Sequence, residues 1–460
     1  MLTTPPSQLR AEPTAREHEL AEVHFQRGNA AGAAARFADA IAYFDAALGL
    51  CPSHVDAHIN RGHALQELGR PHAALASFDR ALAIDPRRGS ALSARGGLLK
   101  EMGRLEEALV ATRAAMRTAP EDINIRKRFF WLQVAHQADY RTLAEAGNEV
   151  ARLSVKRARE ALRARRAISD FRAAHDLAQT DYLLAEGYAC AGLTEANARF
   201  RDICARAPRP SDTPQLVPIT EPEMAVIGRF REQRLRYEPE VPAACLNPDL
   251  DWKTIERGYF AAAPEVAVID DFLSPAALGE LQRFALASTV WKSEYLHQYL
   301  GAFAEDGFLS ALHVQIAAEL KSRLPRILGA QTLEHLWGFK YAPRVTRGID
   351  VHADFAKVNL NFWITRDAAN LDPAGGGLVI YDTPAPTSWT FRDYNADKGL
   401  IADFLASRHA ARRKIPYRCN RAVLFNASLF HETDAIHFKD GYENQRINMT
   451  YLFGRGLAMG

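Results

Sequence analysis

The chain has 460 residues, of which 48% are hydrophobic and 24% charged, a balance typical of globular domains and far from that of a disordered or fibrous chain. Its 57 lysines and arginines nearly offset its 55 aspartates and glutamates, and this net charge of +2 leads us to expect neither nucleic acid nor membrane as a partner. Five scattered cysteines without a C-x-x-C pair, no apolar run near the roughly 18 residues of a bilayer span and no signal-like N-terminus together predict a cytoplasmic protein without a disulfide scaffold.

An internal repeat fills the first part of the chain. Three blocks of 34 residues, 21–54, 55–88 and 89–122, align without a gap. Each has glycine at position 8, alanine at positions 20 and 27 and proline at position 32, within two helical patterns separated by a turn. Small residues allow two helices to cross closely, and proline ends the second helix because it lacks an amide donor. The blocks resemble the tetratricopeptide repeat, which implies an N-terminal α-solenoid with a concave surface for a peptide or protein partner.

The helical pattern continues with a looser register. A fourth unit of this kind is readable at 181–208. Before it, the stretch 152–166 carries seven basic residues against one acidic residue: Arg152, Lys156, Arg157, Arg159, Arg163, Arg165 and Arg166. We interpret this stretch as a solvated helix face, and a cationic wall for an acidic peptide or nucleic acid is the alternative.

A change of composition at Arg206 predicts a domain boundary. The segment that follows is rich in Pro, Ser and Thr and has no helical period. We therefore assign 1–205 to the tetratricopeptide-repeat α-solenoid, 206–262 to a linker with short helices, one of them at 223–235, and 263–460 to a second domain.

The second domain has the pattern of a β-rich fold. A strand-like run at 266–273 precedes a capped helix at 274–288, and short β runs follow at 358–365, 375–382, 420–425 and 447–453, with one helix inserted near 397–409. Runs of this length and spacing predict a sandwich or barrel of the jelly-roll kind, so the whole chain is expected to be an α+β multidomain protein.

A His-x-Asp motif stands at the head of these strands. Residues i and i+2 of a strand point to the same face, so His352 and Asp354 can reach one point and supply two of the three ligands of a facial triad for Fe(II). His54 and Asp56 repeat the motif in a turn between repeats, where we interpret them as structural. His431, which follows a later apolar run, is the expected third ligand.

The last strand predicts a carboxylate pocket beside this site. Arg446, Asn448 and Thr450 share one strand face, and a buried arginine is stabilised by a bidentate carboxylate partner. Two alternatives stay open, because His437 could be the ligand in place of His431 and Lys439 could bind the carboxylate in place of Arg446. We prefer Arg446 because it opens a strand and has polar neighbours at i+2 and i+4, and we prefer His431 because it follows an apolar strand.

Residues 266–453 resemble the Fe(II)/2-oxoglutarate-dependent dioxygenases, particularly the prolyl-4-hydroxylase-like branch. The motifs that carry the resemblance are VAVIDDFLSPAALGEL, the His-x-Asp motif, the GGGLVIYD strand and the distal His and Arg. The resemblance implies a double-stranded β-helix (jelly roll) in which His352, Asp354 and His431 hold Fe(II). It further implies that Arg446 binds the distal carboxylate of the cosubstrate 2-oxoglutarate, with Asn448 beside it and Tyr341 hydrogen-bonded to the cosubstrate, and that O2 is the oxidant.

Other residues of this region have more ordinary interpretations. Asn359 and Asn361 either line the cosubstrate pocket or lie on the wetter face of a strand, Trp363 and Trp389 belong to the core or the rim, and His335 and His409 are structural. Asp354 also disfavours halogenation, because halogenases of this superfamily replace the carboxylate ligand with a small residue.

The preferred function is hydroxylation of a peptide or protein side chain that the repeats dock. One alternative keeps the chemistry but takes a small molecule or a carrier-tethered intermediate as substrate. The other is a catalytically silent barrel on a repeat scaffold.

Overall fold

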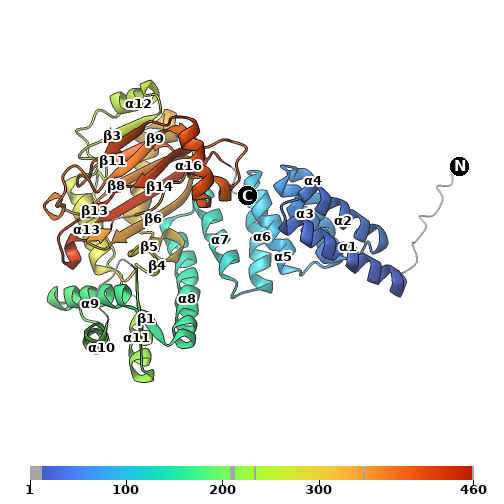
Figure 1. The fold of residues 1–460 in the computed structure, drawn as a ribbon, viewed down its shortest axis with the longest axis horizontal. Helices are drawn as coiled ribbons and strands as arrows, with labels where there is room; N and C mark the ends of the chain where they lie inside the picture. The colour runs from blue at the N-terminus through green and yellow to red at the C-terminus, as the bar shows by residue number, and fades with distance from the viewer. Residues whose placement is uncertain (1–12, 208–212, 233–234, 346–347, 458–460) are drawn as a thin grey trace. The chain divides into compact units, whose positions relative to one another are not determined.

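The computed structural model describes residues 13–207, 213–232, 235–345 and 348–457 (Figure 1). The chain divides into two compact units, Met1–Leu132 and Gln133–Gly460. In the parts of the chain that the structure describes, no helix combines the length and the apolar character that a bilayer crossing requires.

The first unit consists of successive helical hairpins, in the order that the 34-residue period predicts. Its helices are α1 (Ala15–Ala33), α2 (Phe37–Leu50), α3 (Val55–Glu67), α4 (Pro71–Ile84), α5 (Gly89–Glu101), α6 (Leu105–Thr118) and the start of α7 (Ile123–Ala135). Each even-numbered helix from α2 to α6 ends two residues before the repeated proline, where the chain can no longer continue the helical ladder.

The repeated glycine makes room for a phenylalanine of the second helix. A Cβ atom on Gly28 or Gly62 would lie 2.5 Å from the ring of Phe44 or Phe78 respectively, and both rings are buried. Thr112 takes the place of the phenylalanine in the third block. Close helix crossing therefore explains why each block needs glycine at position 8.

The second unit begins with helices that share one apolar core. These are α8 (Tyr140–Arg165), α9 (Asp170–Ala185), α10 (Leu193–Arg206) and α11 (Glu221–Glu232), together with the paired short strands β1 (Ala167–Ser169) and β2 (Leu216–Pro218). Leu162, Phe200, Val217 and Phe230 meet in this core. The segment predicted as a linker thus contributes a strand and a helix to a packed unit.

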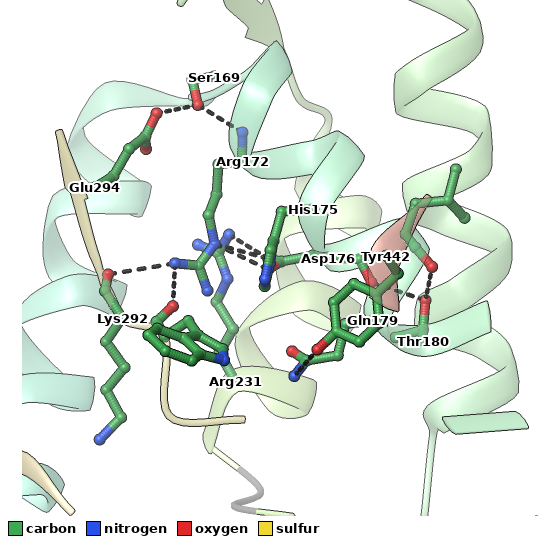
Figure 2. Close-up of polar contacts among 12 residues, drawn as sticks. Ser169, Arg172, His175, Asp176, Gln179, Thr180, Arg231, Lys292, Glu294 and Tyr442 are labelled. Atoms are coloured by element: carbon green, nitrogen blue, oxygen red, sulfur yellow. Dashed lines mark hydrogen bonds and ion pairs between the residues drawn. The ribbon is translucent and has the colours of Figure 1, made fainter. Parts of the chain in front are cut away.

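Helix α9 is also bonded to the β-rich part of the same unit (Figure 2). Arg172 donates to the backbone carbonyls of Trp291 and Lys292 at 2.6 and 3.3 Å. Buried Asp176 lies 2.9 Å from Arg172 and 2.8 Å from Arg231. The division of the structure therefore lies after Leu132, whereas the sequence-predicted boundaries were 205/206 and 262/263.

Antiparallel sheets make up the β-rich part. The larger has the order β3-β11-β8-β14-β6-β5-β4, built from Val266–Ile269, Ala422–Asn426, Ala356–Trp363, Ile447–Arg455, Leu333–Tyr341, Tyr299–Phe303 and Ser293–Tyr295. A second has the order β10-β9-β12, built from Arg412–Ile415, Leu378–Pro384 and Leu429–Thr433, and β7 (Arg344–Val345) pairs with β13 (Ile436–His437). The accompanying helices are α12 (Trp252–Ala261), α13 (Pro275–Ala287), α14 (Ala311–Arg323), α15 (Pro325–Leu328) and α16 (Lys398–Ser407).

Both main sheets contribute to one buried cluster. Phe339 and Trp363 come from the larger sheet, and Leu378, Ile380 and Leu429 come from the three-stranded sheet. This core fixes the spacing of the strands that carry the candidate site.

Candidate metal centre and carboxylate pocket

His352, Asp354 and His431 converge at one end of the core between the two sheets. His352, ahead of β8, pairs with His431 on β12 through two backbone hydrogen bonds of 3.0 and 2.8 Å. One ligand atom from each of the three side chains lies within 4.8 Å of the others. Two segments about 80 residues apart are thus held in the arrangement that a three-ligand metal site requires.

The hydrogen bonds of the two histidines leave their Nε2 atoms for the site. Nδ1 of His352 lies 2.8 Å from the carbonyl of Asp350, and Nδ1 of His431 lies 2.9 Å from that of Leu429. Each contact assigns the proton to Nδ1 and so leaves the Nε2 lone pair as a metal ligand. Burial lowers the pKa of His352 well below its ordinary value, which keeps this imidazole neutral, the form that binds metal.

Asp354 is a buried carboxylate, and among the described residues no lysine or arginine lies at ion-pair distance from it. Its Oδ2 accepts a 2.7 Å hydrogen bond from Asn359 and lies 3.5 Å from Nε2 of His431. Burial raises the pKa of Asp354, although His431 and the Asn359 hydrogen bond lower it in part. A cation among the three ligand atoms would compensate this buried charge, so the donor set fits a divalent metal.

Arg446 lies further along the same cavity and is also buried. Its Nε donates to the carbonyl of Gly376 at 2.6 Å, Nη2 to that of Gly377 at 3.3 Å and Nη1 to Oδ1 of Asn448 at 3.2 Å. A guanidinium has five N–H donors, so one remains on each terminal nitrogen, the pair that a bidentate carboxylate takes. Within the described ranges, no carboxylate lies at ion-pair distance from this side chain.

The predicted cosubstrate residues surround that guanidinium. Its carbon lies 4.9 Å from the centre of the Tyr341 ring and 5.6 Å from that of Trp363, and Asn448 holds it by the hydrogen bond above. Among the described residues, the buried Tyr341 hydroxyl makes no well-aligned hydrogen bond, and burial raises its pKa although the nearby Thr433 and Arg446 side chains lower it in part. A ligand carboxylate at this point would supply the acceptor that the hydroxyl lacks.

One cavity of about 40 Å³ joins the two groups of residues. His352, Asp354 and His431 line one end and Arg446, Asn448 and Thr450 run along one wall. Asn359 and Asn361 also line it, and the Oδ1 atom of each is buried without a donor. These orphaned acceptors favour the interpretation that both asparagines face a ligand pocket.

The structure separates the alternatives that the sequence left open. His437 and Lys439 are exposed and do not line the cavity. His54 caps α3 by accepting from the amide of Ala57, as its structural interpretation requires. Trp363 is fully buried, and Trp389 packs against a neighbouring aromatic cluster.

Sequence reasoning missed several residues that line the cavity. Trp337 and Phe339 share the face of Tyr341 on β6, and Thr433 shares that of His431 on β12. Because residues i and i+2 of a strand point to the same face, these three residues could have been predicted from Tyr341 and His431. Leu378 lines the cavity from β9 and belongs to the GGGLVIYD motif, but no place in the site was predicted for it.

The basic stretch is partly neutralised by its own chain. Arg152 pairs with Glu149 at 3.3 Å, Arg166 pairs with Glu221 at 3.4 Å, and Arg159 pairs with Glu232. Local pairing of this kind supports the interpretation as a solvated helix face.

Comparison with known proteins identifies part of the first unit. Residues 55–88, the second of the three blocks, match the tetratricopeptide repeat family. Similar solved structures include the Arabidopsis OM64 TPR domain (26% identity, 25% of this chain, 97% of that chain, TM-score 0.25) and MamA 41-end from Desulfovibrio magneticus RS-1 (26% identity, 29% and 75%, TM-score 0.28). Another is the first TPR of Spaghetti (RPAP3) bound to an HSP90 peptide (20% identity, 26% and 96%, TM-score 0.26). No curated protein sequence matches the chain.

Proposed function

We propose that the β-rich part is an Fe(II)/2-oxoglutarate-dependent dioxygenase domain with the double-stranded β-helix architecture, and that it hydroxylates a peptide or protein side chain. One observation carries the proposal. A cluster of two histidines and one aspartate, with ligand atoms within 4.8 Å, lines the same cavity as a buried arginine that has no carboxylate at ion-pair distance among the residues that the structure describes. A metal site beside an anion site is what a metal-chelating dicarboxylate cosubstrate requires.

The residues have separable tasks in this proposal. His352, Asp354 and His431 would hold the metal on one face and leave its other positions for the cosubstrate and O2. The chemistry supplied by such a centre is decarboxylation of 2-oxoglutarate to succinate and CO2, coupled to insertion of one oxygen atom into a C–H bond. Arg446 would orient the distal carboxylate through its two remaining N–H donors, with the Tyr341 hydroxyl as a third.

The apolar wall keeps water from the reacting atoms. Trp337, Phe339 and Leu378 line the cavity, and a dry site strengthens the electrostatic contacts made by Arg446 and Asp354.

The tetratricopeptide repeat supports a polypeptide as substrate or partner. Stacked repeats present an extended concave surface suited to peptides, and residues 55–88 lie within such an array. The same chemistry on a small molecule or a carrier-tethered substrate is the second candidate, because the repeats would then serve assembly alone.

An anaerobic titration of the full-length apoprotein tests the metal and cosubstrate sites. Fe(II) followed by 2-oxoglutarate should produce a visible metal-to-ligand charge-transfer band in the wild type, and His352→Ala should abolish it. His437→Ala is the matched control, because this histidine is exposed on β13, and it should keep the band. A folded wild type without a band would refute the dioxygenase and favour a scaffold with a silent barrel.

A further inference from the structure

A second cavity, of about 440 Å³, adjoins the metal pocket. The two share Ile349 and Thr433 in their linings. Asp350 lines the larger cavity, and its carbonyl orients His352 through Nδ1. The volume lies within the range of ligand pockets, so a group bound there would stand directly beside the metal ligands.

The charges of this cavity are arranged with the acidic groups inward. Glu432 pairs with Arg412 at 2.8 Å, and the side chains are 24% and 62% exposed. Asp434 lies 2.8 Å from Lys414, and these side chains are 13% and 48% exposed. In each pair the carboxylate is the more buried member, and the three carboxylates that line the cavity outnumber its two lining basic residues, Lys398 and Arg412.

Two carboxylates retain unused capacity for a donor. Among the described residues, the Asp350 carboxylate has neither an ion pair nor a side-chain hydrogen bond. Oδ2 of Asp434 is buried, and among the described residues it contacts the ammonium of Lys414 in an ion pair that makes no aligned hydrogen bond. A buried acceptor in this state points to a donor that a ligand brings.

The one lysine that lines the cavity is committed to the backbone. Lys398 donates to the carbonyls of Val351 and Asn395 at 3.0 and 2.5 Å. These bonds join the start of α16 to the segment beside His352. Its ammonium is therefore turned toward peptide oxygens.

We propose that this acidic cleft, lined by Asp350, Lys398, Arg412, Glu432 and Asp434, binds a cationic side chain of the substrate on Asp350 and Asp434. A guanidinium or an ammonium supplies the opposite charge that Asp350 lacks among the described residues, and it supplies hydrogen-bond donors that both carboxylates can accept. The inference deepens the proposed function, on which its catalytic meaning rests, and it identifies the substrate as a polypeptide with lysine or arginine at or next to the oxidised residue.

The test measures binding to the full chain without iron, by saturation-transfer NMR. The probes are Nα-acetyl-arginine N-methylamide, the citrulline analogue of the same shape without the charge, and the lysine and glutamate derivatives. One charge-assisted contact predicts that arginine binds about tenfold more tightly than citrulline, and that raised salt reduces the difference. Asp350→Asn should remove this preference. Asp403→Asn, the same change at an exposed position of α16, should preserve it.

Each contrary result overturns the inference. These are equal binding of arginine and citrulline, an unchanged preference in Asp350→Asn, preference for glutamate, or no binding of any probe at millimolar concentration. The Fe(II) titration keeps the two proposals distinguishable. Charge selectivity without a charge-transfer band would refute the dioxygenase alone, and a band without charge selectivity would refute the acidic cleft alone. Equal thermal midpoints for both variants establish that the fold is intact.

Discussion

Replacement of Arg446 separates the charge of this side chain from its geometry. Three of its five N–H donors bond to Gly376, Gly377 and Asn448, and the remaining two lie on different terminal nitrogens. Hydrogen bonds to charged groups contribute about 1.5–3 kcal/mol each, so losing both costs about 3–6 kcal/mol of binding free energy. Since about 1.4 kcal/mol is a factor of ten, Arg446→Met should weaken 2-oxoglutarate binding about 10²–10⁴-fold. Arg446→Lys keeps the charge but not the planar pair of N–H donors, and should weaken 2-oxoglutarate binding about 10–100-fold.

Isothermal titration of 2-oxoglutarate into the Mn(II)-loaded full-length protein measures this directly, because Mn(II) permits binding without turnover. Arg408→Met, at an exposed arginine that follows α16, is the matched control and should bind as the wild type does. The lysine variant guards against a folding defect in the methionine variant. Affinity within threefold of the wild type in a folded Arg446→Met protein would refute the assignment of the carboxylate site.

Four further substitutions test the packing of the repeats and the energetics of two buried charged groups. Gly62→Ala places a Cβ atom 2.5 Å from the Phe78 ring and should lower the free energy of unfolding by about 1–3 kcal/mol. Gly32→Ala, whose Cβ would have no atom within 4 Å, should raise the free energy of unfolding by up to about 1 kcal/mol. Urea unfolding followed by circular dichroism measures whether the two changes have opposite signs. Burial lowers the pKa of Lys340, so Lys340→Met should stabilise the protein at pH 7 by about 1–3 kcal/mol, and the gain should shrink as pH rises toward about 10.4, where the unfolded lysine also loses its charge. Burial alone would raise the pKa of Asp176, but its two arginine partners lower this pKa below the ordinary value. Its contribution to the free energy of unfolding is therefore full above pH about 4 and declines in more acidic solution. Asp176→Asn should cost about 3–5 kcal/mol of stability at pH 7, and its thermal midpoint should fall less steeply than that of the wild type between pH 7 and pH 3.

The sequence predicted those helices and strands that depend on residues close to one another in the chain. Small residues at fixed spacing located the helix pairs of the first unit, and apolar alternation located β8, β9, β11 and β14. The candidate ligands were accessible for the same reason, since His352 and Asp354 are two residues apart and His431 ends an apolar run. The hairpin of β4 and β5 was missed, because its burial depends on neighbours that are distant in the sequence.

The domain boundary shows where composition misleads. The Pro- and Ser-rich segment after Arg206 has the composition of a linker, yet β2 and α11 follow it at once and pack into a shared core. Composition reports that a segment is irregular, and it cannot report whether the elements on either side pack together. The acidic cleft was equally out of reach, because its five charged residues come from four separate stretches of the chain.

The two faces of β6 explain why the helices of the second unit belong to the site. Tyr341 faces the cavity, and its neighbour Lys340 points to the opposite face, where its ammonium lies 3.2 Å from the centre of the Tyr442 ring. Gln179 of α9 donates to the hydroxyl of Tyr442 at 3.0 Å (Figure 2). It also donates to the carbonyl of Ser288 at 3.0 Å. Helix α9 thus supports the back of the strand that carries Tyr341, and the proposed site, if it acts as a catalyst, needs such support to hold its residues in place. Helix α9, the first of the helix pair that resembles a fourth repeat, is therefore bonded to the β-rich part of its own unit.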